Sequence, residues 1–203
     1  MSPKRFWVFR AVAFLAIAAG VNFCARAQAQ DSAVLKPPPG AKLALIVFED
    51  LQCPLCARDY PLLQQAVRDY KIPLVRYDFP LAMHSWSFEA AVWGHYFDSK
   101  SRKLGDDFRG YIFEHQAEIA PETLRSFVEK FAGQQKIVAP FIPDPHGKFK
   151  AEVEAEQATG TRIGIKHTPT IYIVSNNHTG PPEEVVDANQ LYQMIDAMKA
   201  ETR

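Results

Sequence analysis

The amino-acid sequence predicts an α/β protein in which helices flank a central mixed sheet. A helical insertion separates a strand–helix–strand half from a strand–strand–helix half. Three observations predict this fold class. An apolar run at 43–48 indicates a strand buried on both faces, and residues with helical spacing follow it. From Pro80 to about Gly160 the apolar residues keep a helical period, and at 170–174 strand composition returns.

The length and charge of the chain limit the class of protein. Its 203 residues fit one domain, or one domain with a large insertion. Lysine plus arginine equals aspartate plus glutamate at 23 each, and no long run of one charge sign occurs. Because there is no basic excess, we expect no nucleic-acid partner.

Residues 1–29 have the pattern of a secretory signal peptide. Basic residues precede an apolar run at 11–21, and small residues at 27–29 predict cleavage after Ala29. The apolar run is shorter than the about 20 residues of a membrane span, although an uncleaved anchor is the alternative. Cys24 leaves with the signal. We therefore expect a periplasmic or otherwise exported chain that keeps two cysteines.

The predicted N-terminal half of the fold covers 42–80. Residues 30–41, with three consecutive prolines, form an extended lead-in. The strand at 43–48 is followed by a helix with Pro54 in its first turn, where proline is tolerated. A second strand is predicted at 72–79. Strand–helix–strand order predicts that the two strands pair in parallel.

The predicted helical insertion covers 81–162, and the C-terminal half covers 163–203. Aromatic residues recur at helical spacing through the insertion, and we expect them to form a helical core rather than a cofactor or peptide site. A strand is predicted at 170–174 and a short edge strand at 184–186. A capped amphipathic helix after Asp187 closes the chain.

The motif Cys53-Pro54-Leu55-Cys56 lies where the buried strand meets the following helix. Unpaired backbone N–H groups and the positive end of the helix dipole point at the Cys53 sulfur in such a position. This environment favours the thiolate, which is the nucleophile of disulfide exchange. The motif therefore predicts a reactive cysteine.

Three other uses of the two cysteines have less support. A structural zinc site needs four ligands, and the mature sequence has neither a second cysteine pair nor a closely spaced histidine pair. A disulfide that closes so short a loop stabilises a fold by only about 2 kcal/mol. Inert buried thiols are not expected at a helix start. We therefore expect exchange chemistry, with no metal and no cofactor.

A second motif, Thr168-Pro169, directly precedes the predicted strand at 170–174. A proline there gives up a hydrogen-bond donor of the sheet, and an X–Pro bond adopts the cis form at modest cost. A trans proline that starts a strand is the ordinary alternative. Together with the cysteine motif, the sequence favours a cis bond in a loop that lies against Cys53 and Cys56.

These motifs resemble those of the DsbA-like thiol:disulfide oxidoreductases, a group within the thioredoxin-fold superfamily. The residues that match the subgroup pattern Phe-x-Asp-x-x-Cys-Pro-x-Cys are Phe48, Asp50, Cys53, Pro54 and Cys56. The stretch 164–170 is similar to the Gly-(Val/Ile)-x-x-Thr-Pro-Thr loop of the family, and 79–81 with His84 resembles the start of its helical insertion. The likeness covers essentially the whole mature chain and implies a thioredoxin fold.

The resemblance also implies roles for the motif residues. Cys53 would be the exposed nucleophile and Cys56 the buried resolving thiol of a redox disulfide. Thr168 and Pro169 would form the loop that faces the substrate. The implied activity introduces disulfides into cysteine-containing client proteins, after which a membrane quinone-linked thiol oxidase restores the Cys53–Cys56 disulfide.

Two positions depart from the pattern of the family. Leu55 stands where well-known oxidases carry a histidine that stabilises the thiolate, and Val47 stands where many thioredoxin-fold proteins have a buried acid. The candidate tuning residues are Pro54, Leu55, Glu49 and Asp50. The two acids could handle a proton, although acids at a strand end are usually solvated. The sequence therefore leaves the direction of the redox reaction open.

Two alternatives to an oxidase follow from these residues. One is a reductase or isomerase supplied by a membrane electron donor, with the isomerase disfavoured because no separate dimerisation segment is recognisable. The other is a copper-binding or non-catalytic thioredoxin-fold module, in which Cys53, Cys56 and His84 would hold the copper ion.

Overall fold

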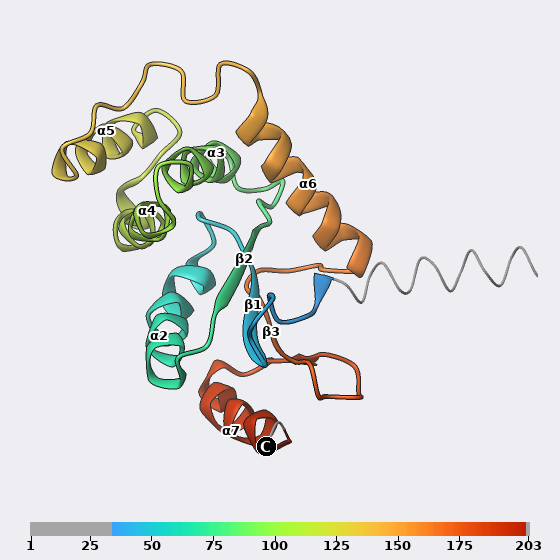
Figure 1. Ribbon diagram of the computed structural model, residues 1–203. Helices are drawn as coiled ribbons and strands as arrows, with labels where there is room; N and C mark the ends of the chain where they lie inside the picture. The colour runs from blue at the N-terminus through green and yellow to red at the C-terminus, as the bar shows by residue number, and fades with distance from the viewer. Residues whose placement is uncertain (1–33, 202–203) are drawn as a thin grey trace, which may run out of the picture. The chain divides into compact units, whose positions relative to one another are not determined.

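The central strand of the sheet is β1 (Leu43–Glu49), in which all seven residues are buried. The computed structural model describes residues 34–201. The chain divides into residues 1–36 and 37–203, and the helices and strands labelled in Figure 1 belong to the second unit. The predicted signal peptide at 1–29 and the first residues of the lead-in lie outside the described residues.

The sheet is mixed, as predicted, with the strand order β2-β1-β3-β4. Strand β2 (Leu74–Asp78) pairs with β1 in parallel, and β3 (Thr170–Ser175) pairs with β1 antiparallel. The second strand begins at Leu74 rather than at Ile72 because Pro73 has no N–H to donate. The Pro73 carbonyl still accepts from the Leu45 N–H of the neighbouring strand β1, at 3.0 Å.

The edge strand is β4 (Glu183–Glu184), which pairs antiparallel with β3. The prediction of 184–186 was wrong in its bounds. The Val185 N–H still donates to the Ile171 carbonyl at 2.8 Å, whereas the Val186 side chain is exposed. Pairing therefore ends where the chain turns away from β3.

Helices cover both faces of the sheet. Helices α2 (Pro54–Tyr70) and α7 (Leu191–Glu201) share one apolar cluster with alternate residues of β1 and β3. Figure 1 shows α6 (Lys148–Ile163) on the other side of the strands. There, Gly160 lets the backbone of α6 approach the ring of Phe79.

The insertion is helical, as predicted. Helices α3 (Ser87–Asp98), α4 (Arg102–His115) and α5 (Leu124–Gln134) precede α6. Their fully buried side chains form one core: Trp93, Phe97, Phe108, Ile112, Leu124 and Phe131. The aromatic residues therefore serve packing, which confirms that prediction. No helix within 34–201 combines the length and the apolar composition needed to cross a membrane.

Candidate active site

The two cysteines lie where β1 ends and α2 begins. Cys53 is the N-cap residue of α2, with extended backbone and no side-chain cap, and Pro54 begins the helix. Both cysteines are free thiols, so the structure shows the reduced pair. The sequence therefore placed the motif correctly at the junction of the strand and the helix.

Both thiols are largely covered, which corrects the expectation of an exposed nucleophile. Cys53 is 6% exposed and Cys56 is 3% exposed. The two side chains belong to the same apolar cluster as the core of the insertion. The insertion therefore packs over the start of α2 and leaves little of Cys53 accessible.

The loop before β3 lies against Cys53, although the two are 115 residues apart in sequence. The Thr168–Pro169 peptide bond is cis, as predicted. The Cys53 thiol donates to the Thr168 carbonyl, with Sγ 3.2 Å from the oxygen. Thr168 is itself buried, and its hydroxyl makes no hydrogen bond while Cys53 is a thiol. The hydroxyl is therefore available to the thiolate.

The two cysteines have opposite pKa shifts. A hydrogen bond from the Cys56 thiol lowers the pKa of Cys53 to about 5, against the effect of burial. The Thr168 side chain and the backbone N–H groups of Cys56 and Leu55 lower it further. Burial, and next the contact with Cys53, raise the pKa of Cys56 above its usual range. One sulfur is thus prepared to ionise and the other to hold its proton.

Asp50 is buried rather than solvated, which corrects the ordinary expectation for an acid at a strand end. It is only 1% exposed. Its carboxylate accepts from four donors: the backbone N–H groups of Gln52 and Leu81, the Nδ1 of His84 and the hydroxyl of Ser87. The Asp50 N–H also donates to the Cys56 sulfur, at 3.4 Å. Asp50 therefore joins the cysteine turn to the segment before α3.

Glu49 is also buried, at 2% exposure, so it is not a solvated acid either. Its Oε1 lies 3.0 Å from Nε of Arg76 and 4.0 Å from Nε of Arg109. Burial raises the pKa of Glu49, whereas the two arginines lower it. The charge of Glu49 contributes to the raised pKa of Cys56. Glu49 thus affects the Cys56 thiol electrostatically.

Of the other candidate tuning residues, Pro54 begins the helix and Leu55 acts on Cys53 through its backbone N–H. Leu55 is 49% exposed, and its side chain offers no hydrogen bond.

Gln116, which follows α4, is a site residue that the sequence did not reveal. Its Nε2 donates to the carbonyls of Leu51 and Cys53 at 2.8 and 3.1 Å. A single glutamine at a helix end carries no sequence signal for such a contact.

The copper site suggested by the sequence is not formed. The His84 Nδ1 lies 2.7 Å from an oxygen of Asp50, which holds the ring. Among the described residues 34–201, a cluster of three possible metal ligands occurs elsewhere, and it includes neither cysteine. Within that part of the chain, His84 does not complete a site with Cys53 and Cys56.

Comparison with known proteins identifies the family. A family model described as Thioredoxin matches residues 38–197. The sequence matches no curated protein.

Solved structures show the same fold at low sequence identity. The thiol-disulfide exchange protein alpha-DsbA2 from Wolbachia pipientis has 16% identity and a TM-score of 0.64, covering 89% of this chain and 98% of that chain. Pseudomonas aeruginosa DsbA2 has 21% identity and a TM-score of 0.59, covering 81% and 93%. Proteus mirabilis ScsC in a transitional conformation has 15% identity and a TM-score of 0.66, covering 99% and 100%.

The sheet order and the helices that flank the sheet agree with these similarities. The expected resemblance and fold class are confirmed. The chain therefore belongs to the thioredoxin family and has the fold of the DsbA proteins.

Proposed function

We propose that this protein is an exported thiol:disulfide oxidoreductase that introduces disulfides into other proteins through Cys53 and Cys56. The observation that carries the proposal is the opposite pKa shift of the two thiols. A low pKa at the nucleophile stabilises the reduced pair at neutral pH. A stabilised reduced form makes the corresponding disulfide a stronger oxidant.

The proposed reaction starts from the Cys53–Cys56 disulfide. A client thiolate attacks Sγ of Cys53, a mixed disulfide forms, and Cys56 leaves as a thiolate that takes up a proton. A second thiolate of the client then attacks the client sulfur of the mixed disulfide and releases Cys53 as a thiolate. The client loses two electrons and gains a disulfide, while the cysteine pair gains the two electrons.

The structure suggests what each neighbour contributes to these steps. The low pKa of Cys53 makes it a good leaving group in the second step, and the raised pKa of Cys56 keeps it protonated once it has left. Thr168 and Pro169 lie at the reacting sulfur, where the loop could receive an extended client segment. A client must therefore present its cysteine in a flexible stretch that fits the covered site.

The proposal also includes the cellular setting. The signal pattern at 1–29 supports export to an oxidising compartment, where a disulfide-forming protein has its substrates. Each turnover leaves the pair reduced, so a membrane quinone-linked thiol oxidase would have to accept its two electrons. A reductase supplied by a membrane donor is the second candidate, favoured by Leu55, whose side chain gives the thiolate no hydrogen bond.

Trapping of mixed disulfides tests the proposed exchange. In Cys56→Ser the resolving thiol is missing, so clients attached to Cys53 should accumulate and should be released by a reductant. Cys53→Ser is the matched control and should trap nothing. If Cys56→Ser accumulates no mixed disulfides in the compartment where the protein resides, the chain is a binding module rather than an exchange enzyme.

A further inference from the structure

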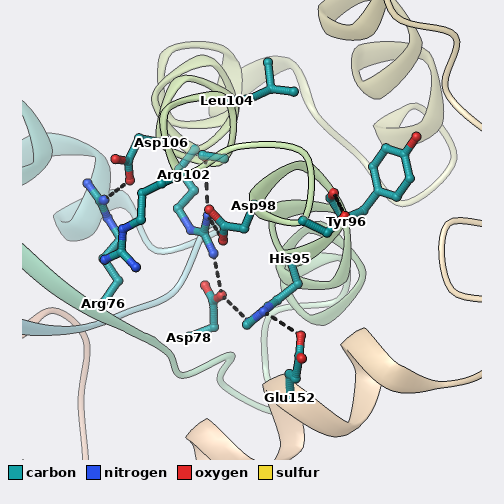
Figure 2. A network of polar contacts seen from close by, with 12 residues as sticks. Arg76, Asp78, His95, Tyr96, Asp98, Arg102, Leu104, Asp106 and Glu152 are labelled. Carbon is teal, nitrogen blue, oxygen red and sulfur yellow. Dashed lines mark hydrogen bonds and ion pairs between the residues drawn. The ribbon is translucent and has the colours of Figure 1, made fainter.

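A second cluster of charged side chains lies apart from the cysteines, around a cavity of about 480 Å³. It is built from the end of β2 and from helices α3, α4 and α6, and Figure 2 shows how its members face one another. The polar residues that line the cavity are Arg76, His95, Asp98, Arg102, Asp106, Arg109, Glu152 and Glu156. The proposed exchange reaction uses none of them directly.

His95 occupies the centre of one side of this cluster, with a carboxylate at each ring nitrogen (Figure 2). Its Nδ1 lies 3.2 Å from Oε2 of Glu152, whereas its Nε2 lies 3.3 Å from Oδ2 of Asp78 and 3.7 Å from Oε2 of Glu156. The Nε2 atom is buried and makes no hydrogen bond. Two carboxylates therefore face one ring nitrogen, and a positive charge at that nitrogen, either a proton or a metal ion, relieves their repulsion.

A histidine whose far nitrogen is held by a carboxylate is a common arrangement at metal sites. When Nδ1–H donates to Glu152, the tautomer is fixed and the lone pair of Nε2 is directed at Asp78 and Glu156. The three ligand atoms all lie within 4.8 Å of one another. Two ligands about 2.1 Å from a tetrahedral metal are about 3.4 Å apart, so the separations of 3.3 and 3.7 Å fit such an ion.

Asp78 also has one unpaired carboxylate oxygen, which is not the oxygen that lies 3.3 Å from His95. The residue is almost completely buried at the end of β2, yet its Oδ1 has no hydrogen-bond partner. Arg109 donates to the other oxygen, Oδ2, at 2.9 Å. A buried carboxylate oxygen without a donor is costly unless something positive reaches it. Five carboxylates lie at or next to the cavity (Asp78, Asp98, Asp106, Glu152 and Glu156), against three guanidiniums (Arg76, Arg102 and Arg109). With His95 neutral, a divalent cation would balance this difference.

We propose that Asp78, His95 and Glu156 bind one divalent transition-metal ion of the Zn²⁺ type, with Glu152 positioning the histidine ring. One imidazole nitrogen and two carboxylates suit zinc or its first-row neighbours better than calcium or magnesium, which prefer all-oxygen sites. The ion would take the place of a proton on Nε2. It would tie β2, α3 and α6 together at one point, and so fix the insertion to the sheet.

Metal titration of a variant without the reactive thiols tests the proposal. In the Cys53→Ser/Cys56→Ser background the thiols cannot compete for the ion. Co²⁺ and Zn²⁺ are added separately to the full chain after treatment with a chelator, and binding is followed by calorimetry and by the visible spectrum of Co²⁺. We expect one bound ion per chain and an increase in the thermal midpoint.

Variants in the same background locate the bound ion. His95→Gln and Glu156→Gln should each weaken binding at least tenfold, and Glu152→Gln should weaken it by about tenfold or less because it acts through the ring. Glu154→Gln is the matched control, since Glu154 is an exposed residue of the same helix paired only loosely with Lys150. It should bind as tightly as the parent.

Two results would overturn the proposed metal site. Failure of the folded parent to bind either ion at millimolar concentration overturns it, as does equal binding by His95→Gln and Glu156→Gln. If His95→Gln does not fold, Glu156→Gln decides, with circular dichroism as the check of folding. The outcome is independent of the exchange activity, because the titrated protein has no reactive cysteine.

Discussion

The hydrogen bond between the two thiols should dominate the acidity of Cys53, and replacing Cys56 tests this. With a pKa of about 5, about 99% of Cys53 is thiolate at pH 7, against about 3% for a free cysteine of pKa about 8.5. The Cys56 thiol makes the largest contribution to that difference. We therefore predict that Cys56→Ala raises the pKa of Cys53 by at least about one unit, equivalent to a tenfold change in the ratio of thiolate to thiol.

Cys56→Ser should have a smaller effect, since the serine hydroxyl can still donate to the thiolate at nearly the same position. The backbone N–H groups of Leu55 and residue 56 remain in both variants, so neither should reach the pKa of a free cysteine. The assay is the thiolate absorbance of the reduced protein, followed as a function of pH. The rate of alkylation over the same pH range provides an independent midpoint.

Two results would refute this reasoning. A midpoint that stays near 5 in Cys56→Ala would mean that the helix N-terminus and Thr168 suffice without the second thiol. Equal shifts in Cys56→Ala and Cys56→Ser would mean that packing, and not the donated hydrogen bond, sets the pKa of Cys53.

Three further predictions concern stability. Because the pKa of Cys53 is lower in the folded protein than in the unfolded chain, the thiolate stabilises the reduced protein fully above about pH 8.5. This contribution is lost as the pH falls to about 5. Denaturation midpoints of the reduced and oxidised forms should therefore show the stability advantage of the reduced form shrinking across that range. Asp50→Ala removes a buried acceptor of four hydrogen bonds and should lower the free energy of unfolding, measured by urea titration, by about 3–5 kcal/mol. A decrease of less than about 1 kcal/mol would mean that water replaces the carboxylate. Gly160→Ala should destabilise the protein by about 1–3 kcal/mol, because the new Cβ would lie 2.6 Å from the Phe79 ring. Gly133→Ala in α5 is the control: its Cβ meets nothing within 4 Å, so it should stabilise the protein by up to about 1 kcal/mol. Equal effects of the two substitutions would contradict the packing argument.

The order of helices and strands could be predicted because it is encoded locally. The buried run that forms β1 and the aromatic spacing of α3 to α5 depend on neighbours a few positions away. The juxtaposition of Thr168-Pro169 and Cys53 could be predicted because both motifs flank strands that pair in this fold class. The bounds of the edge strand could not be predicted, because the length of β4 depends on how far one loop runs alongside β3.

The burial of charged side chains could not be predicted from the sequence. Glu49 and Asp50 follow a strand, a position where acids usually meet water, but their partners come from distant segments. Asp50 is covered by residues that are more than thirty positions away, such as Leu81 and Ser87. Likewise, the burial of Cys53 depends on how the helices of the insertion pack over it, and the spacing of apolar residues in the sequence does not specify that packing.

The redox potential of the Cys53–Cys56 pair tests the central claim most directly. The reduced and oxidised protein would be equilibrated with glutathione buffers of known composition, and the fraction reduced would be measured. The low pKa of Cys53 predicts a potential well above the about −270 mV of thioredoxin, as expected of a protein that donates disulfides. A potential at or below that of thioredoxin would contradict the oxidase and leave the reductase as the function.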